Sequence, residues 1–441
     1  MNIQIKEKNY LLLIVAHIII GLAINVLQAL SVIYGALIFL LSIYFIIKTR
    51  NRNNEVIYAC AYIVGSEVFL RMTEGNPSYE FSKYCLVLFS IIGIFYSGLS
   101  KNAIPYWIFL LLLVPAVIIG AESLGIKTNI RTTISFNISG PLSLGFMSIY
   151  CYQKKIKLSE LNNIILILGL PIISCAAYLL LYTSKISADL SSTGSNFDLS
   201  GGFGPNQVST ILGLGMFVFF SRVLLVSRTK LMLFINLAIG IYIGYRGLLT
   251  FSRGGMVTAV LMLIILLFII YLYSKKESKL KLFFIVSFMV VMISGIMIYS
   301  AYKTDGLITN RYTNKDAIGR EKKSASTGRS QISLEEFDLF LKNPLFGVGV
   351  GRGGEIRAEK SEFVASHNEL TRMLAEHGSL GIICLLILFI TPIILYLDNK
   401  EHIYMFCFLT FWLLTINHAA MRTAAPAFIY ALTLLKVKFY E

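Results

Sequence analysis

Two arginines in the second half of the chain have sequence surroundings suited to binding phosphate groups. Arg253 lies about one turn inside an apolar run, in Ser252-Arg253-Gly254-Gly255, where an unpaired charge costs on the order of a few kcal/mol. The small neighbours favour close approach by a ligand or another helix. Arg329 comes shortly before Ser333-Leu334-Glu335-Glu336, a capping-box pattern that predicts a short amphipathic helix. A guanidinium beside a helix N-terminus suits phosphate oxygens, although a snorkelling Arg253 and a solvated Arg329 are the simpler alternatives.

The histidine with the most informative surroundings is His367, in Ser366-His367-Asn368-Glu369. This is a second capping-box pattern, and Gly378 is a plausible end of its helix. At the first helical position, the positive end of the helix dipole disfavours an imidazolium. We therefore expect His367 to be neutral and able to accept a proton from a hydroxyl group. A merely polar surface histidine is the alternative, and His377 and His418, in weaker surroundings, are expected to be structural.

Four further residues are candidates for substrate binding: Arg246, Asn206, Asn368 and Arg352. Arg246, at the turn before Arg253, is expected either to join the same basic cluster or simply to flank its helix. Asn206 follows the tight entry Gly201–Pro205 and is suited to cap the helix that begins there. No Asp-x-Asp pair or His/Cys cluster in the long polar segment points to a metal, so the sequence predicts neither a metal site nor a cofactor.

The composition indicates that membrane helices position these residues. Of the 441 residues, 56% are hydrophobic and 14% are charged, whereas a soluble domain carries about 25% charged residues. The net charge of +15 does not indicate nucleic acid, because most basic residues lie in short loops between apolar runs, where they set the orientation of the chain. The six cysteines lie in or beside apolar runs without CxxC spacing, which indicates neither disulfides nor zinc.

The predicted fold class is an all-α polytopic membrane protein of about fourteen transmembrane helices with a long helical outer loop. Residues 1–301 are expected to hold the first eleven helices, residues 302–377 the loop with two short helices, and residues 378–441 the last three helices. The expected spans are 10–27, 31–48, 55–71, 80–98, 105–120, 134–152, 162–183, 206–226, 229–245, 249–273, 281–301, 378–397, 402–418 and 423–436.

Basic residues fall on every second connection between these spans, which predicts that those connections and both termini are cytoplasmic. The segment 302–377 is then on the outer side. It carries many Lys and Arg against the simple charge rule, and an anionic ligand is one explanation. Glu67 and Arg71, four residues apart near the outer end of the third span, are expected to pair with each other.

At these residues the chain resembles the O-antigen ligase and O-antigen polymerase superfamily of bacterial membrane glycosyltransferases. Ligases have a histidine followed by Asn, Ser or Gln, nine residues, and Gly-x-x-Gly, and here His367 and Asn368 precede Gly378 and Gly381 at that spacing. Ile382 stands where the family often has threonine. Four further stretches look like recurring elements of the family: 343–349, 328–329, 252–254 and 205–206. The resemblance covers roughly 200–385.

The resemblance implies a GT-C type bundle in the bacterial inner membrane with its active site on the periplasmic side. It implies that a glycan on undecaprenyl diphosphate is transferred en bloc to an acceptor hydroxyl, without nucleotide sugar and without metal. Arg253 and Arg329 would bind the diphosphate, and His367 would activate the acceptor. Two arginines directed at a leaving group that gains charge would stabilise the transition state more than the ground state.

Four functions remain open at this point. The favoured one, on the histidine motif, is a ligase of lipopolysaccharide biosynthesis whose acceptor is lipid A–core. A polymerase that extends a growing glycan has the same donor and site, and a protein O-oligosaccharyltransferase would use a serine or threonine. A non-enzymatic transporter of lipid-linked sugars is disfavoured, because transporters usually place polar groups near the membrane midplane and have internal repeats.

Overall fold

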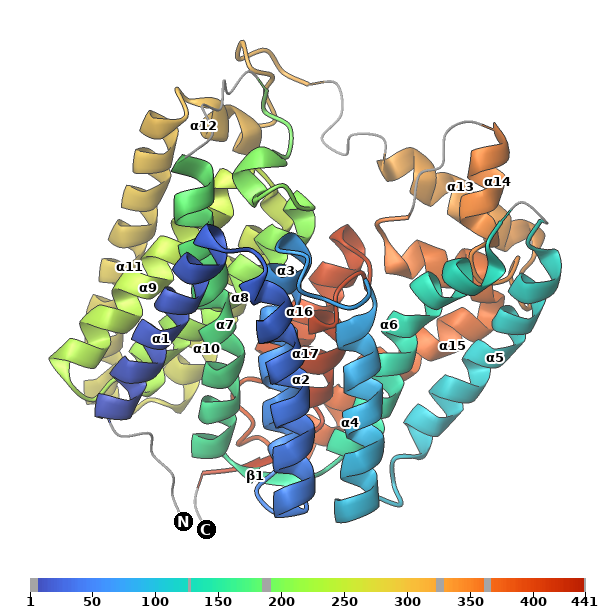
Figure 1. Cartoon of the computed structure of the whole chain (residues 1–441), viewed down its shortest axis with the longest axis horizontal. Helices are drawn as coiled ribbons and strands as arrows, with labels where there is room; N and C mark the ends of the chain where they lie inside the picture. The colour runs from blue at the N-terminus through green and yellow to red at the C-terminus, as the bar shows by residue number, and fades with distance from the viewer. Residues whose placement is uncertain (1–6, 126–127, 185–191, 323–328, 361–365, 440–441) are drawn as a thin grey trace.

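The computed structural model describes residues 7–125, 128–184, 192–322, 329–360 and 366–439. In these ranges the protein is a bundle of α-helices with one pair of short parallel strands (Figure 1). The elements in chain order are α1 (Glu7–Val26), α2 (Leu30–Thr49), α3 (Glu55–Met72), α4 (Phe81–Ser97), α5 (Ile104–Ser123), α6 (Ile130–Cys151), β1 (Lys155–Lys157), α7 (Leu158–Ser184), the 3-10 turn η1 (Asp198–Ser200), α8 (Pro205–Leu225), α9 (Lys230–Leu249), α10 (Arg253–Tyr273), α11 (Lys276–Lys303), α12 (Leu307–Tyr312), α13 (Arg329–Lys342), α14 (Arg352–Lys360), α15 (Glu369–Leu397), α16 (Met405–His418), α17 (Ala425–Leu432) and β2 (Lys436–Lys438).

The fold class predicted from the sequence is confirmed, because every predicted span overlaps a helix. In the described ranges, nine helices are long and apolar enough to cross a membrane: α1, α2, α5, α7, α8, α9, α10, α11 and α15. The predicted last span, 423–436, is wrong as one continuous helix. Its helix α17 has only 8 residues, about 12 Å, against the roughly 30 Å of a bilayer core. Every residue of α17 is buried, so its neighbours rather than its length hold it in the bundle.

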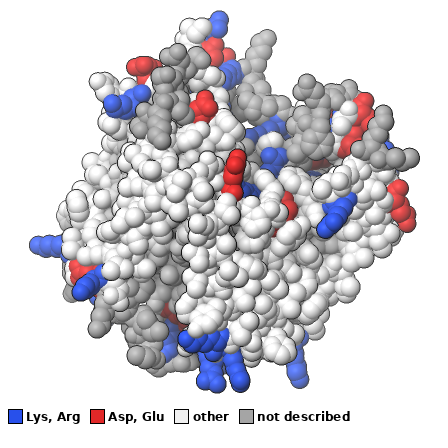
Figure 2. All heavy atoms as spheres, in the orientation of Figure 1, with Lys and Arg blue, Asp and Glu red and all other residues white. Residues whose placement is uncertain are grey.

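Opposite ends of the bundle differ in what they carry. β1 pairs in parallel with β2, so the connection after α6 lies at the end where α1 begins and the chain finishes, called the termini end below (Figure 1). α12, α13 and α14 lie at the other end, called the loop end. Lys and Arg gather towards the two ends of the bundle, and a broad band with few charges separates them (Figure 2). Some Lys and Arg lie in a hollow of the loop end, with α12 on one side of the hollow and α13 and α14 on the other (Figure 2).

Small residues let α10 pack closely on its neighbours. A Cβ added to Gly255 would lie 2.3 Å from the main chain of Ser209 on α8, and one on Gly254 would lie 2.3 Å from the ring of His418 on α16. The small residues around Arg253 therefore serve the approach of other helices, one of the two interpretations open from the sequence. This packing fixes the start of α10, and Arg253 with it, at the loop end.

The helices of the loop end begin at other residues than the capping patterns predict. α13 already contains Arg329, so the predicted start at Ser333 is wrong and Ser333 lies inside the helix. The second predicted helix forms the first part of α15 and ends at Gly378, the predicted stop, where φ 60° and ψ −140° are not helical and are favourable to glycine. The apolar face of α13 is exposed, since Leu334 and Leu341 are 70% and 60% exposed.

Candidate functional site

Three arginines from three helices come together at the loop end. We call Arg253, Arg311 and Arg329 the arginine group. Arg253 Nη1 donates a hydrogen bond to the carbonyl of Arg311 at 3.3 Å, and Arg311 Nε donates to the carbonyl of Phe251 at 2.9 Å. Burial lowers the pKa of Arg311, and the nearby Arg253 and Arg329 lower it further. Burial and then Arg253 also lower the pKa of Arg329. The structure thus holds three like charges within reach of one another, which favours an anionic ligand.

The start of α10 is fixed by hydrogen bonds to α8. Ser252 Oγ donates to Asn206 Oδ1 at 2.8 Å, and Ser209 Oγ donates to the carbonyl of Ser252 at 2.8 Å. The predicted capping role of Asn206 is wrong, because α8 begins at Pro205 with Gly204 as its N-cap. Asn206 instead ties the residue before Arg253 to α8. The structure therefore places Asn206 beside the arginine group as a support of its position.

His367 lies beside the arginine group, but not at a helical position. Asn368 is the N-cap of α15, and its Oδ1 accepts a hydrogen bond from the amide of Leu370 at 2.9 Å. His367 therefore precedes the helix, and the expectation that it occupies the first helical position is wrong. It is half-buried and lines a cavity of about 160 Å³. The cavity is lined by Arg329, Ser330, Ile332, Ser333, Ser366, His367, Asn368 and Asn417.

Hydrogen bonds to the end of α16 and to the turn after it hold both sides of this cavity. The amide of Ala420 donates to the carbonyl of His367 at 3.0 Å, and Arg329 Nη1 donates to the carbonyl of His418 at 3.5 Å. The side chain of His418 contacts Leu414 O and Thr210 Oγ1, and His377 is buried in α15, which agrees with structural roles for both. The end of α16 and the residues after it therefore set the position of His367 relative to Arg329.

Two of the sequence candidates lie in other surroundings. Arg246 is buried, and its guanidinium donates to Thr183 Oγ1 and to the carbonyl of Leu179 on α7, each at 3.1 Å. Arg352 forms ion pairs with Glu355 and Glu359, and the hydrogen bond that it donates to Glu355 raises the pKa of Arg352. The structure gives both arginines protein acceptors of their own and does not bring them into the arginine group.

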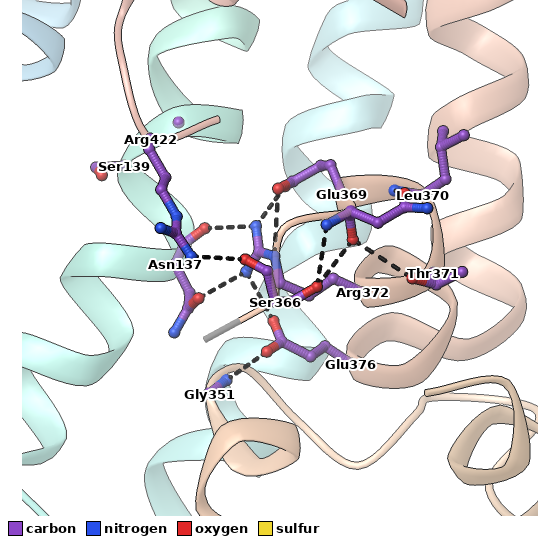
Figure 3. A network of polar contacts seen from close by, with 12 residues as sticks. Asn137, Ser139, Gly351, Ser366, Glu369, Leu370, Thr371, Arg372, Glu376 and Arg422 are labelled. Carbon is purple, nitrogen blue, oxygen red and sulfur yellow. Dashed lines mark hydrogen bonds and ion pairs between the residues drawn. The ribbon is translucent and has the colours of Figure 1, made fainter. Parts of the chain in front are cut away.

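A buried ionic network at the start of α15 escaped the sequence analysis (Figure 3). Arg372 pairs with Glu369 and with Glu376 Oε2, the latter at 2.9 Å, and it also donates to Asn137 on α6 at 3.0 Å. Glu376 Oε1 accepts from the amide of Gly351 at 3.0 Å. These contacts join α15, α6 and the loop before α14, and so fix the helix that follows His367.

Arg311 is the member of the arginine group that sequence reasoning missed. It lies in the six-residue helix α12, which is too short to show an apolar period. The signal that pointed to it was the unexplained number of basic residues in 302–377, and that signal does not single out one arginine.

A family model described as O-antigen ligase matches residues 238–386. The matched range contains all three members of the arginine group as well as His367. A search of the curated proteins finds no match to this chain.

The arginine group predicts binding of inorganic pyrophosphate to the purified protein in detergent. Arg311→Met should weaken the Kd measured by titration calorimetry at least tenfold, because a hydrogen bond to a charged group contributes about 1.5–3 kcal/mol. Arg352→Met is the control and should leave the Kd unchanged, because Glu355 and Glu359 already neutralise Arg352. Equal binding by wild type and Arg311→Met would remove Arg311 from the anion site.

Proposed function

We propose that the chain is a member of the superfamily of O-antigen ligases and polymerases and transfers a lipid-linked glycan at the arginine group, because residues 238–386 match a family model described as O-antigen ligase. The donor is a glycan on undecaprenyl diphosphate, and the acceptor is a hydroxyl group. The observation that carries this proposal is that His367 and Arg329 line one cavity, with Arg253 and Arg311 beside Arg329. A GT-C type architecture is part of the proposal.

In the proposed reaction the arginine group stabilises the leaving group and one residue acts as the base. The acceptor oxygen attacks the anomeric carbon, the bond from that carbon to the phosphate oxygen breaks, and the diphosphate leaves with the electron pair. The arginine group stabilises the charge that develops on the diphosphate, so no metal ion takes part in the proposed step. His367 accepts the proton of the acceptor hydroxyl. Asn368, the N-cap residue beside it, lines the same cavity and helps to place the acceptor.

The acceptor separates the two leading forms of this proposal. The spacing of His367 and Asn368 to Gly378 and Gly381 favours a ligase that uses lipid A–core in lipopolysaccharide biosynthesis. A polymerase that extends a growing glycan would use the same donor and the same residues. Transfer to purified lipid A–core but not to a second lipid-linked repeat unit supports the ligase, and the reverse preference supports the polymerase.

The proposed orientation places the loop end in the periplasm and the termini end in the cytoplasm of a bacterial inner membrane. A polyprenyl diphosphate donor presented on the periplasmic side would meet the arginine group there. The support is the distribution of basic residues in the short connections, which favours the cytoplasm.

Cysteine labelling tests this orientation with little background, because all six native cysteines are buried. Ile318, 79% exposed near α12, and Asn53, exposed in the connection between α2 and α3, are suitable positions. A membrane-impermeant maleimide should label Ile318→Cys in cells with a permeabilised outer membrane and should label Asn53→Cys only after lysis. The opposite pattern would contradict the orientation and the periplasmic site.

The proposed base is tested by His367→Ala in a gel assay of purified protein, lipid-linked donor and acceptor. Loss of general-base assistance should lower turnover about 10²–10⁴-fold, while donor binding changes little because the arginine group holds the donor. His367→Gln keeps a hydrogen-bonding side chain without the base and should be nearly as inactive. Turnover of His367→Ala close to that of wild type would leave the arginine group as an electrostatic site whose base is another residue.

A further inference from the structure

The turn at residues 419–424, between α16 and α17, supports the cavity of the proposed site. Its Ala420 amide donates to the carbonyl of His367 at 3.0 Å. Its Arg422 Nη2 donates to the carbonyl of Ser366 at 3.0 Å. Ala420 has a φ of 52°, so the turn holds a non-glycine residue in the left-handed region, which persists only where surrounding contacts determine it. The position of His367 therefore depends on this turn.

A buried ion pair on α3 holds the same turn from the other side. Glu67 and Arg71 pair at 2.7 Å, as the sequence predicted, and both side chains are almost fully buried. Glu67 Oε2 accepts from the amide of Ala424 at 2.7 Å, and Arg71 Nη1 donates to the carbonyl of Arg422 at 2.9 Å. The pair thus fixes two main-chain groups of the turn, one on each side of Thr423.

Arg71 is itself held rigidly. Its Nη1 also donates to Gln207 Oε1 at 2.8 Å, and its Nη2 donates to the carbonyl of Tyr79 at 2.5 Å. The guanidinium lies 3.9 Å from the centre of the Tyr79 ring, whose hydroxyl accepts from Gln207 Nε2 at 2.9 Å. The planar guanidinium of Arg71 thus donates to Gln207, Tyr79 and Arg422 at the same time, which the single ammonium group of a lysine does not reproduce.

We propose that Glu67 and Arg71 are positioning residues that act on the reaction through the 419–424 turn, which sets the place of His367 in the cavity. The inference rests on the proposed glycosyl transfer and extends it to α3, far outside the matched range 238–386. A buried ion pair is weak evidence for a gain in stability, and specifying geometry is a use such pairs have in other proteins. Because a displacement of about 1 Å can cost about 10²-fold in rate, loosening the turn affects transfer without removing any reacting group.

The first test measures steady-state transfer by Arg71→Lys in detergent or nanodiscs. We expect kcat to fall at least about tenfold, because the amide of Ala420 in the turn donates to the carbonyl of His367 and a loosened turn displaces His367. The donor KM should stay within about threefold of wild type, because the arginine group that binds the donor is unchanged. Glu67→Gln should lose less, since its amide oxygen still accepts from Ala424. A kcat of wild-type size in Arg71→Lys would overturn the inference.

The matched control is Arg222→Lys. Arg222 is also a buried arginine beside a tyrosine, 4.9 Å from the centre of the Tyr10 ring, but it lies about 20 Å from Gln207 along α8, towards the termini end. We expect its kcat to stay close to wild type even where its melting temperature falls as much as that of Arg71→Lys. Equal losses of kcat in the two variants would assign the effect to general destabilisation and overturn the inference.

Hydrogen exchange tests the inference independently of glycan transfer. Peptides that cover 419–424 and 366–372 should exchange about tenfold faster in Arg71→Lys than in wild type, and at the wild-type rate in Arg222→Lys. Faster exchange in Arg71→Lys with no transfer by wild type would sustain the positioning role and reject the proposed function. Unchanged exchange of both segments in Arg71→Lys would reject the positioning role itself.

Discussion

Repulsion between the guanidinium groups of Arg253, Arg311 and Arg329 is the interaction around which the loop end is built. Burial lowers the pKa of Arg311 and of Arg329; the charges of Arg253 and Arg329 lower that of Arg311 further, and the charge of Arg253 lowers that of Arg329 further. Their arrangement is held by main-chain carbonyl acceptors, those of Arg311, Phe251 and His418. An anion that enters among the three charges relieves their repulsion, which favours a diphosphate over a neutral ligand.

Such a group keeps its geometry only if rigid elements surround it. Two buried ionic networks support the main chain around His367: Glu67 with Arg71 on α3, and Glu369 with Arg372 and Glu376 on α15. The first network reaches His367 through the 419–424 turn, and the second fixes the helix that follows it. Close packing of Gly255 on α8 fixes Arg253 in the same way. The site therefore depends on helices from the whole length of the chain, including α3, which lies far from it in sequence.

Local sequence patterns identified the long helices and several residues of the candidate site. Apolar runs predicted every long helix, and the costly position of Arg253 and the motif at His367 identified residues that the structure brings near one another. The place of His367 before α15 could not be predicted, because Ser366 and Asn368 are both suitable N-cap residues and the fold uses Asn368. Arg311 and the 419–424 turn depend on contacts between residues far apart in sequence, such as Ala424 with Glu67. The same limit explains Arg246 and Arg352, whose acceptors only the fold reveals.

The central claim is that one diphosphate binds the arginine group with His367 beside it. The most direct measurement is an electron cryomicroscopy structure of the protein in nanodiscs with undecaprenyl diphosphate bound. The account predicts phosphate oxygens within hydrogen-bonding distance of the guanidinium groups of Arg253, Arg311 and Arg329, with His367 facing the same cavity. A diphosphate bound at Arg246 or Arg352 instead, with the arginine group unchanged, would contradict it.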